Sequence, residues 1–563
     1  MLVFPPVALK PDVRDHLRNT FTNEELVSEV GEEVADREFE ALLSSLSHPP
    51  SFTCVRVNTH LAPQQQIQHA LQQELTGQQL CGCHGEDASL VPLPHPQLPD
   101  VLLLPIIGPR YTHTHTSRCP PVTHHWTQVH THTSRCPPVT HHWTQVHTHT
   151  HFQMSSCYPS LDPGTHTHTH TSRCSPVTHH WTQVHTHTLP DVLLLPIIGP
   201  RRVCVLDSEV VVGAQCGSSV LRGAHVFAPG VLSAPKTLQV GDMVSVFSDV
   251  ENKCTRGAKS FEGQKVFLGN GVCEMSRSEV FCSKGLMRGV AVRMTDRLYI
   301  TPCFDRVLPH LVFLQNLPSV LVSHVLGPRS GECVLDMCAA PGGKTTHIAT
   351  LMRNQGVVVA LDKIRSKVEK LRENAANQQL DCIQAFCCNS IQAVATGTSP
   401  SQKSMWDGAN GPPFPEGSFD RVLLDAPCSG LGQRPNMAVS SSLKEIRSYQ
   451  PLQRKLFNTA VHLLKRGGVL VYSTCTVTLA ENEEQVAWAL RTFPYLTLQP
   501  QEPNLGEQGM LGAGLSHDQR RLLQRFHPRM NEGGASDGHA PMPCLDDADS
   551  DTIGFFIAKF FKS

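Results

Sequence analysis

The stretch VLDMCAAPGGKTTHIATLM, residues 334–352, decides the fold of this chain. An apolar run typical of a buried strand ends in a loop of small residues and leads into a helix-like segment. The start of such a helix offers free N–H groups to a ligand. Gly342 and Gly343 let that ligand approach the backbone where a side chain would block it. The stretch therefore predicts a strand, a ligand-binding loop and a helix.

The next strand indicates what the ligand is. VVVALDK places Asp362 twenty residues after Gly342, at the tip of this strand, where a carboxylate can accept hydrogen bonds from both hydroxyls of a ribose. The loop is not the GxGxxG of dinucleotide sites, and Lys344 lacks the spacer and first glycine of a phosphate loop. An adenosine-containing cofactor is therefore predicted. A tight turn beside an acidic strand end is the alternative for this motif taken alone.

Two cysteines follow two further strands. FDRVLLDAPCSGLGQRPN places Asp425 and Cys428 just beyond one strand, and GGVLVYSTCT places Cys475 beyond another. Ligands of parallel sheets bind outside the carboxyl ends of the strands, so these residues should converge on the cofactor loop. Neither motif contains a histidine, which argues against a metal site. Nucleophilic catalysis is favoured, with inert packed thiols as the alternative.

Composition limits the compartment and the partners. The 563 residues include 47 Lys and Arg against 49 Asp and Glu, so any nucleic acid must be bound by a local patch. The 21 cysteines are odd in number, and the N-terminus lacks a secretion-type apolar region, so we expect a reducing, cytoplasmic location. No apolar run is long enough to span a bilayer.

An internal repeat interrupts the first half of the chain. LPDVLLLPIIGPR occurs at 98–110 and again, unchanged, at 189–201. Between the copies, 111–188 holds 18 of the 32 histidines, in Thr-His alternation and three copies of an SRC motif. Imidazoles and cysteines offer a metal-binding interpretation, but no CxxC pair is present and the apolar content is low. We predict an unfolded insertion without function, and we expect the second copy to occupy the folded position.

The pattern predicts an α/β chain of several parts. Residues 1–97 read as an accessory α+β region and 98–188 as the duplicated segment with the insertion. Short Val-rich runs divided by glycines predict a small β domain over 189–293. Alternating strands and amphipathic helices predict a Rossmann-like catalytic domain with a parallel-rich sheet over 294–563. Its predicted strands are ECVLDMCA, VVVALD, FDRVLLDAP, GVLVYSTC and TIGFFIAKFF.

The catalytic motifs resemble those of the Nop/Sun family of RNA cytosine-C5 methyltransferases. The resemblance is carried by DMCAAPGGKTTHIA, LLDAPCSGLGQRPN, YQPLQRKLF, YSTCTVTLAENEEQVAWAL and GFFIAKF. It implies that Cys475 attacks cytosine C6, that Cys428 assists product release, and that Asp425 hydrogen-bonds the base, with Lys344 nearby. The residues alone leave the two cysteine roles exchangeable.

The resemblance also implies S-adenosylmethionine as the cofactor. The implied contacts are Cys338, Ala339, Ala340, Pro341, Gly342, Gly343, Lys344, Asp362 and Asp425, and an acidic residue after the third strand. This sequence has Asn389 at that last position, where an amide can still accept one hydrogen bond. A catalytically impaired RNA-binding protein of the same fold is therefore the alternative function.

The β domain resembles a PUA domain, an RNA-binding module, through VVVGAQCGSSVLRGAHVFAPGV and GDMVSV. Residues 202–294 hold 11 basic and 8 acidic side chains, the sign of charge that phosphate contact requires. The predicted RNA contacts are Arg222, Arg256, Lys259 and Lys265. PUA-bearing members of the family imply transfer RNA as the partner. We expect a monomer with no metal and no membrane association.

Overall fold

The computed structural model describes residues 5–77, 91–106, 112–113, 203–282, 288–305, 307–395, 410–529, 545 and 548–563. Its central sheet has the strand order β15-β14-β13-β16-β17-β20-β18, with β19 also paired to β20. The strands are β13 Cys333–Asp336, β14 Val357–Asp362, β15 Ile383–Cys387, β16 Phe419–Asp425, β17 Leu464–Thr474, β18 Leu496–Leu498, β19 Leu523–Phe526 and β20 Phe555–Lys562. Strands β13 to β17 are mutually parallel, and β20 is antiparallel. The predicted Rossmann-like sheet is confirmed.

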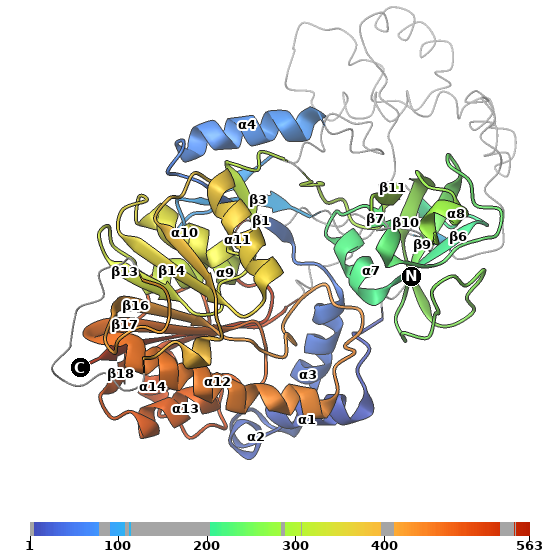
Figure 1. Ribbon diagram of the computed structural model, residues 1–563. Helices are drawn as coiled ribbons and strands as arrows, with labels where there is room; N and C mark the ends of the chain where they lie inside the picture. The colour runs from blue at the N-terminus through green and yellow to red at the C-terminus, as the bar shows by residue number, and fades with distance from the viewer. Residues whose placement is uncertain are drawn as a thin grey trace, which may run out of the picture. The chain divides into compact units, whose positions relative to one another are not determined.

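Helices cover both faces of this sheet (Figure 1). The helices are α9 Leu317–Leu326, α10 Gly343–Leu351, α11 Arg365–Asn377, α12 Leu443–Leu463, α13 Glu483–Thr492 and α14 His517–Arg521. Side chains alternate along each strand, so that Val334 packs toward α9 and α10 while Leu335 packs toward α12 and α13. Because both faces are buried, the strands read as continuous apolar runs in the sequence. The carboxyl ends of the parallel strands meet at one edge, on either side of β13.

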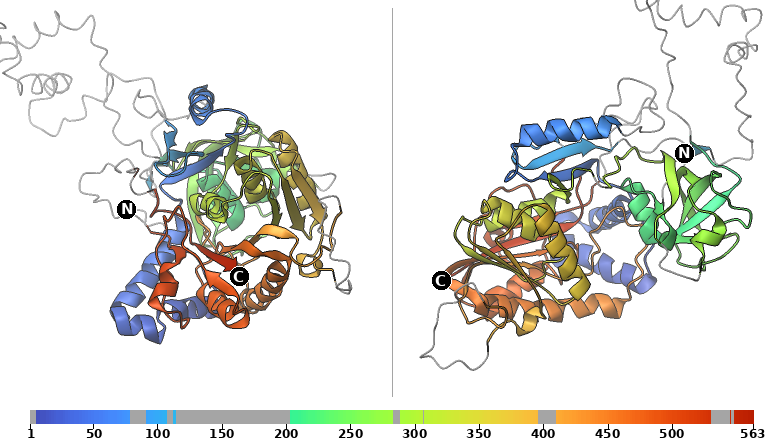
Figure 2. Two further views of the ribbon diagram at one scale, coloured as in Figure 1. Left: turned by 90° about the vertical axis from the view of Figure 1, so that its left-hand side faces the viewer. Right: turned by 45° about the horizontal axis from the view of Figure 1, so that its top comes forward.

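The N-terminal region forms a second, smaller sheet, of order β12-β1-β3-β2. Its elements are β1 Phe52–Val57, α4 Gln64–Gly77, β2 Leu93–Pro94, β3 Val101–Pro105 and β12 Val312–Leu314. Helix α4 covers one face, as Figure 2 shows, and the other face packs against α9 and α10. The predicted boundary at residue 294 is therefore wrong for this segment, because β12 belongs to this sheet and pairs with β1.

Strand β3 comes from the first copy of the repeat. Val101 to Leu104 are buried and pair with β1 in an antiparallel register. The expectation that the second copy occupies the folded position is wrong for this strand, since the first copy lies next to β2 and completes the sheet. The second copy and residues 114–188 lie outside the described residues.

The β-rich domain has a six-stranded sheet of order β7-β11-β10-β9-β6-β8. Its elements are β6 Glu209–Gly213, α7 Ala214–Leu221, β7 Val226–Phe227, β8 Val231–Ser233, β9 Met243–Asp249, β10 Lys265–Cys273, α8 Arg277–Val280 and β11 Val290–Arg297. A further short pair joins β4 Thr112–His113 to β5 Val203–Cys204. The predicted small β domain is present, but it also holds α7, and β11 runs beyond the predicted end at residue 293.

Three N-terminal helices pack beside the catalytic domain: α1 Pro11–Phe21, α2 Glu24–Val30 and α3 Glu32–Ser47. Their apolar side chains, such as Leu17 and Phe39, share a core with Leu431, Ile446 and Leu479. Helices α2 and α3 are separated by Gly31 and supply part of the helical content predicted for residues 1–97. No helix in the described part of the chain combines the length and apolar character needed to cross a membrane.

Candidate active site

The loop between β13 and α10 lies at the carboxyl edge of the sheet, as predicted. Its N-terminal part is fixed by backbone hydrogen bonds from Met337 N to Leu423 O (3.0 Å) and from Ala339 N to Leu361 O (2.9 Å). Gly342 has φ of 103° and precedes the first residue of α10, so a residue with a side chain would be strained there. The loop is thus attached to β16 through Met337 and to β14 through Ala339, the strands on either side of β13.

Asp336, the last residue of β13, is a functional candidate that the sequence interpretation missed. It is 1% exposed and lines the pocket beside this loop. Its Oδ2 accepts a hydrogen bond from Thr345 Oγ1 (2.8 Å), whereas Oδ1 is buried without a partner. Burial raises the pKa of its carboxyl to about 7. An acidic residue directly before a cofactor loop was the available signal.

Lys344 and Asp425 form an ion pair across this edge. Lys344 Nζ lies 2.7 Å from Asp425 Oδ2, and Ser473 Oγ donates to Asp425 Oδ1 (2.7 Å). The lysine side chain is 11% exposed and the aspartate 29%, so the carboxylate keeps one side open. The lysine also lies over the Phe555 ring. Lysine, aspartate and loop are thus brought together as the sequence predicts.

The two predicted cysteines are in contact. The sulfur atoms of Cys428 and Cys475 lie 3.3 Å apart, and both are free thiols. The hydrogen bond from Cys428 lowers the pKa of Cys475, against the effect of burial, with Gln433 and Lys344 acting in the same direction. The pKa of Cys428 is raised well above its usual value by its hydrogen bond with Cys475, by burial and by the charge of Glu481. The opposite directions of the two pKa shifts therefore favour Cys475 as the thiolate.

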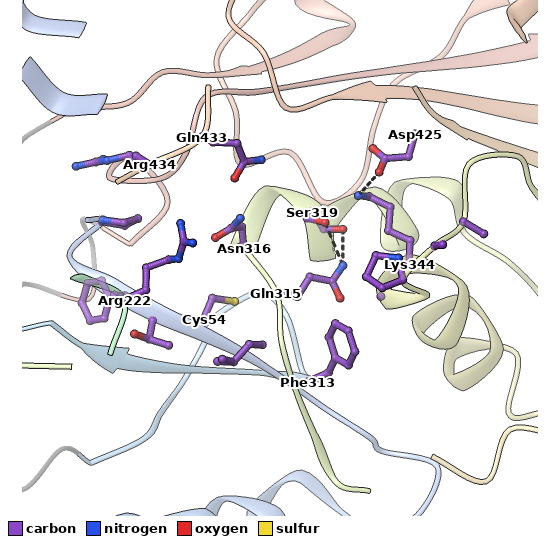
Figure 3. Close-up of a pocket in the computed structure, with 18 of the residues that line it drawn as sticks. Cys54, Arg222, Phe313, Gln315, Asn316, Ser319, Lys344, Asp425, Gln433 and Arg434 are labelled. Atoms are coloured by element: carbon purple, nitrogen blue, oxygen red, sulfur yellow. Dashed lines mark hydrogen bonds and ion pairs between the residues drawn. The ribbon is translucent and has the colours of Figure 1, made fainter. Parts of the chain in front are cut away.

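A cavity of about 440 Å³ opens beside Lys344 and Asp425, and neither Cys428 nor Cys475 is among its lining residues. In Figure 3, Lys344 and Asp425 lie at one end, and Arg222 and Arg434 at the other. The cofactor loop forms one wall, and the small sheet contributes Phe52 to Cys54 and Phe313 to Gln315. The pocket is therefore built by the catalytic domain, the accessory sheet and one residue of the β-rich domain.

Two other predicted cofactor contacts lie on the same sheet edge but do not line this pocket. Asp362 ends β14, and its Oδ1 accepts a hydrogen bond from Ile364 N (2.9 Å). Asn389 follows β15, is exposed, and accepts from Ile391 N (3.3 Å). The side-chain oxygen of Asn389 is therefore engaged by the backbone of its own turn, and the side chain itself is exposed.

The four predicted RNA contacts differ in their surroundings. Arg222 lines the pocket and Lys259 is exposed. Arg256 donates hydrogen bonds to the carbonyl groups of Ala228, Pro229, Val231 and Val280. Lys265 pairs with Glu209 and lies over the Phe247 ring. Arg256 and Lys265 thus already serve the packing of their own domain.

One group among the described residues has the composition of a metal site. Asp100 lies 2.8 Å from His324 Nε2 through Oδ1 and 2.5 Å from His347 Nε2 through Oδ2. These oxygen to nitrogen separations are those of direct hydrogen bonds, whereas a shared zinc ion, at about 2 Å from each ligand, would hold the ligands farther apart. The group is therefore described as a hydrogen-bonded triad, and the absence of a metal stays a prediction.

A parallel-rich sheet of this order, with its ligand loop after the central strand β13, defines a class, the S-adenosylmethionine-dependent methyltransferases. The model of the family described as 16S rRNA methyltransferase RsmB/F matches residues 323–560. The crystal structure of NSun6 from Pyrococcus horikoshii with SFG has the same fold, with a TM-score of 0.60 and 23% identity over 99% of this chain and 98% of that one.

Two curated relatives match over the full length of the chain, and a third matches over part of it. The tRNA (cytosine(72)-C(5))-methyltransferase NSUN6 of Mus musculus is 46% identical over 100% of this chain and 98% of its own length. The Homo sapiens NSUN6 is also 46% identical, over 100% and 99%. A tRNA (cytosine(72)-C(5))-methyltransferase of Pyrococcus horikoshii is 31% identical over 63% of this chain and 75% of its own. The chain belongs to the Nop/Sun family of RNA cytosine-C5 methyltransferases, and its cofactor is S-adenosylmethionine.

Proposed function

We propose that this enzyme forms 5-methylcytosine in transfer RNA through a covalent bond between Cys475 and the base. The observation that carries the proposal is the pair of thiols 3.3 Å apart at the strand ends that also hold Asp425 and Lys344. The substrate follows the NSUN6 relatives, whose names give tRNA as their substrate. Transfer RNA in a reducing cytoplasm is the proposed setting.

Cytosine C5 becomes nucleophilic only after a group has added to C6. In our proposal the Cys475 thiolate forms the Sγ–C6 bond, and the C5=C6 electron pair becomes available for methylation at C5. The C5 proton then departs to a base, the C5=C6 bond re-forms, and the Sγ–C6 pair returns to Cys475. Asp425 hydrogen-bonds the N3 and N4 edge of the base and stabilises the adduct. Cys428 assists release.

The surroundings of the two thiols support this division of roles. Cys475 faces Gln433 and the positive charge of Lys344, which favour a thiolate. Cys428 faces the carboxylate of Glu481, which disfavours a second negative charge. The nucleophile must be the thiol that ionises more readily, so Cys475 is the proposed nucleophile.

The residues at the loop fit the cofactor. The unpartnered, buried Oδ1 of Asp336 lies where the pocket adjoins the loop, and a carboxylate there suits the ammonium group of a methionine moiety. We propose that residues 338–344 hold this moiety, that Asp362 accepts hydrogen bonds from the ribose, and that Asn389 contacts the adenine. Bound S-adenosylmethionine supplies the methyl group.

The RNA surface is proposed to be the β-rich domain, in a PUA-like role, acting from a monomeric enzyme. Arg222 reaches the pocket that holds Asp425, so it can contact a phosphate next to an unpaired cytosine. Lys259 is the second proposed contact. Arg256 and Lys265 are proposed to support RNA binding indirectly, by stabilising the β-rich domain. Arg256 donates to backbone carbonyl groups, and Lys265 pairs with Glu209.

Incubation with tRNA and methyl-labelled S-adenosylmethionine tests the proposal. Wild type should transfer label to cytosine C5, and Cys475→Ala should transfer none. Cys428→Ala should accumulate a protein-RNA adduct that survives denaturation. If Cys475→Ala traps the adduct, the cysteine roles are reversed; if wild type binds tRNA and methylates no cytosine, the proposed activity is wrong.

A further inference from the structure

Three consecutive polar residues, Glu481, Asn482 and Glu483, are buried immediately after the Cys475 loop. Their exposed fractions are 2%, 0% and 0%. They belong to the stretch TVTLAENEEQV, in which Glu481 and Asn482 precede α13 and Glu483 is its first residue. The mechanism proposed above uses only the charge of Glu481 and gives no role to Asn482 or Glu483. Burial of two carboxylates and an amide is costly unless every group is hydrogen-bonded, so their partners indicate what they hold in place.

Glu481 holds the turn that carries Cys428. Its Oε2 accepts hydrogen bonds from Ser429 N and Gln453 Nε2 (3.0 Å each), and its Oε1 accepts from Ser429 Oγ (2.6 Å) and Thr478 Oγ1 (3.0 Å). Gln453 also donates to Pro427 O (2.9 Å). The residues on both sides of Cys428 are therefore bound to one carboxylate and its partner amide.

Asn482 holds the strand end that carries Cys475. Its Oδ1 accepts a hydrogen bond from Thr474 Oγ1 (2.5 Å), and its Nδ2 donates to Thr476 O (3.1 Å). The residues before and after Cys475 are thus bound to one amide. A hydrogen bond between Ser429 Oγ and Thr476 Oγ1 (2.7 Å) joins the two cysteine loops directly.

Glu483 anchors these contacts to the core. Both of its oxygens lie 2.9 Å from Arg525 Nη1, and its Oε1 also accepts from Met510 N (2.9 Å). Arg525 is 1% exposed and donates to Val477 O as well. A buried ion pair of this kind fixes position more than it adds stability. The tripeptide therefore has little freedom to move relative to the sheet.

We infer that Glu481 and Asn482 are positioning residues for the two thiols, each acting on a different step. Glu481 fixes Cys428, and its charge adds to the hydrogen bond with Cys475 and to burial, which raise the pKa of that thiol. Asn482 fixes Cys475 for attack. The inference rests on the proposed function. It assigns the positioning of the nucleophile Cys475 to Asn482 and the positioning of the release thiol Cys428 to Glu481. Loss of Glu481 should impair release of the adduct, and loss of Asn482 should impair its formation.

The test uses the full-length enzyme with tRNA and S-adenosylmethionine. In Glu481→Gln, an NH2 group replaces one of the two carboxylate oxygens that accept hydrogen bonds from Ser429, Gln453 and Thr478. Two donors then face each other, so we expect the turn that carries Cys428 to shift. We expect turnover to fall at least about tenfold, because a displacement of about 1 Å can cost up to about a hundredfold, while denaturation-resistant adduct accumulates. In Asn482→Asp, a carboxylate oxygen replaces the NH2 group that donates to Thr476 O. The substitution removes this hydrogen bond and adds a negative charge close to Cys475. We expect slower adduct formation with no accumulation, and a pH profile shifted upward.

The matched control is Glu484→Gln at the next position, where the carboxylate bonds Gln450 and touches neither cysteine loop. It should behave as wild type. Cys428→Ala serves as the positive control for adduct. If Cys428→Ala traps adduct but Glu481→Gln turns over normally, or if Glu481→Gln and Asn482→Asp lose the same step, the positioning inference is wrong. If Cys428→Ala traps none, the cysteine assignment itself fails.

A second variant guards against misfolding of Glu481→Gln. Ser429→Ala removes one hydroxyl from the same carboxylate and leaves Glu481 in place. It should accumulate adduct in the same way at a smaller loss of turnover. A folded Ser429→Ala enzyme with wild-type turnover and no adduct would overturn the role of Glu481.

Discussion

At the scale of single residues, the contact between Cys428 and Cys475 affects the pKa of Cys475. The hydrogen bond from the Cys428 thiol is the leading cause that lowers the pKa of Cys475. In the proposed mechanism the Cys475 thiolate attacks the base, so adduct formation should rise with pH through the Cys475 pKa, which lies below the usual value of a free thiol. In Cys428→Ala the donor is lost, the pKa of Cys475 rises, and this limb of the profile should move to higher pH.

Single-turnover adduct formation measured against pH checks this expectation. Cys428→Ser keeps a hydroxyl donor and should retain most of the wild-type position of the limb. A profile that stays fixed in Cys428→Ala would mean that burial and the other neighbours, Gln433, Asp425 and Lys344, set the Cys475 pKa without Cys428.

At the scale of secondary-structure elements, helix α10 is attached to the accessory sheet by buried polar contacts. Asp100 accepts hydrogen bonds from His347 on α10 and His324 on α9, and Arg56 Nη2 donates to Thr346 Oγ1 (2.8 Å). Burial lowers the pKa of His347 to about 4, so at neutral pH it is an uncharged N–H donor to the carboxylate. Because α10 begins at the cofactor loop, these contacts connect the small sheet to the position of that loop.

Asp100→Asn tests the value of this attachment. The amide can accept from only one histidine and sets its NH2 group against the other, so unfolding free energy should fall by about 1–3 kcal/mol. The repeat supplies a matched control, because Asp191 has the same neighbours in sequence. Asp191→Asn should leave denaturant unfolding unchanged. Equal effects of the two variants would show that the copies share the folded position.

The same elements show what the sequence could and could not predict. Strands β13, β14, β16, β17 and β20 were predictable, since buried parallel strands are apolar runs and their ends carry the chemistry. The partner of β12 was not, because its pairing with β1 joins residues far apart in the sequence, such as Val55 and Leu314. The place of β3 was not, because two identical copies of its sequence are present in the chain. Helix α7 was not predicted either, because it directly follows a Val-rich strand and its short sequence AQCGSSVL resembles a turn. The tripeptide at Glu481 lies within the motif YSTCTVTLAENEEQVAWAL, but its contacts with Ser429 and Thr474 arise only in the folded chain.

At the scale of the whole molecule, the described residues on either side of the His-rich insertion lie next to each other. Thr112 pairs with Val203, and neighbouring strands lie about 4.8 Å apart. Deleting 111–201 joins Arg110 to Arg202 and keeps the first copy, which supplies β3. A shorter connection costs less closure entropy, so the shortened enzyme should keep wild-type methyl transfer with equal or greater thermal stability.

The identical copies sharpen this experiment. Deleting 98–188 instead would give the same polypeptide, because the retained second copy has the sequence of the first. The informative comparison is deletion of 98–201, which removes both copies. It therefore removes strand β3, which pairs with β1 and whose residues Leu102 to Leu104 are buried. That variant should lose the small sheet, the docking of α10 through Asp100, and methyl transfer. Activity retained after deletion of 98–201, or lost after deletion of 111–201, would contradict the role of the first copy as strand β3.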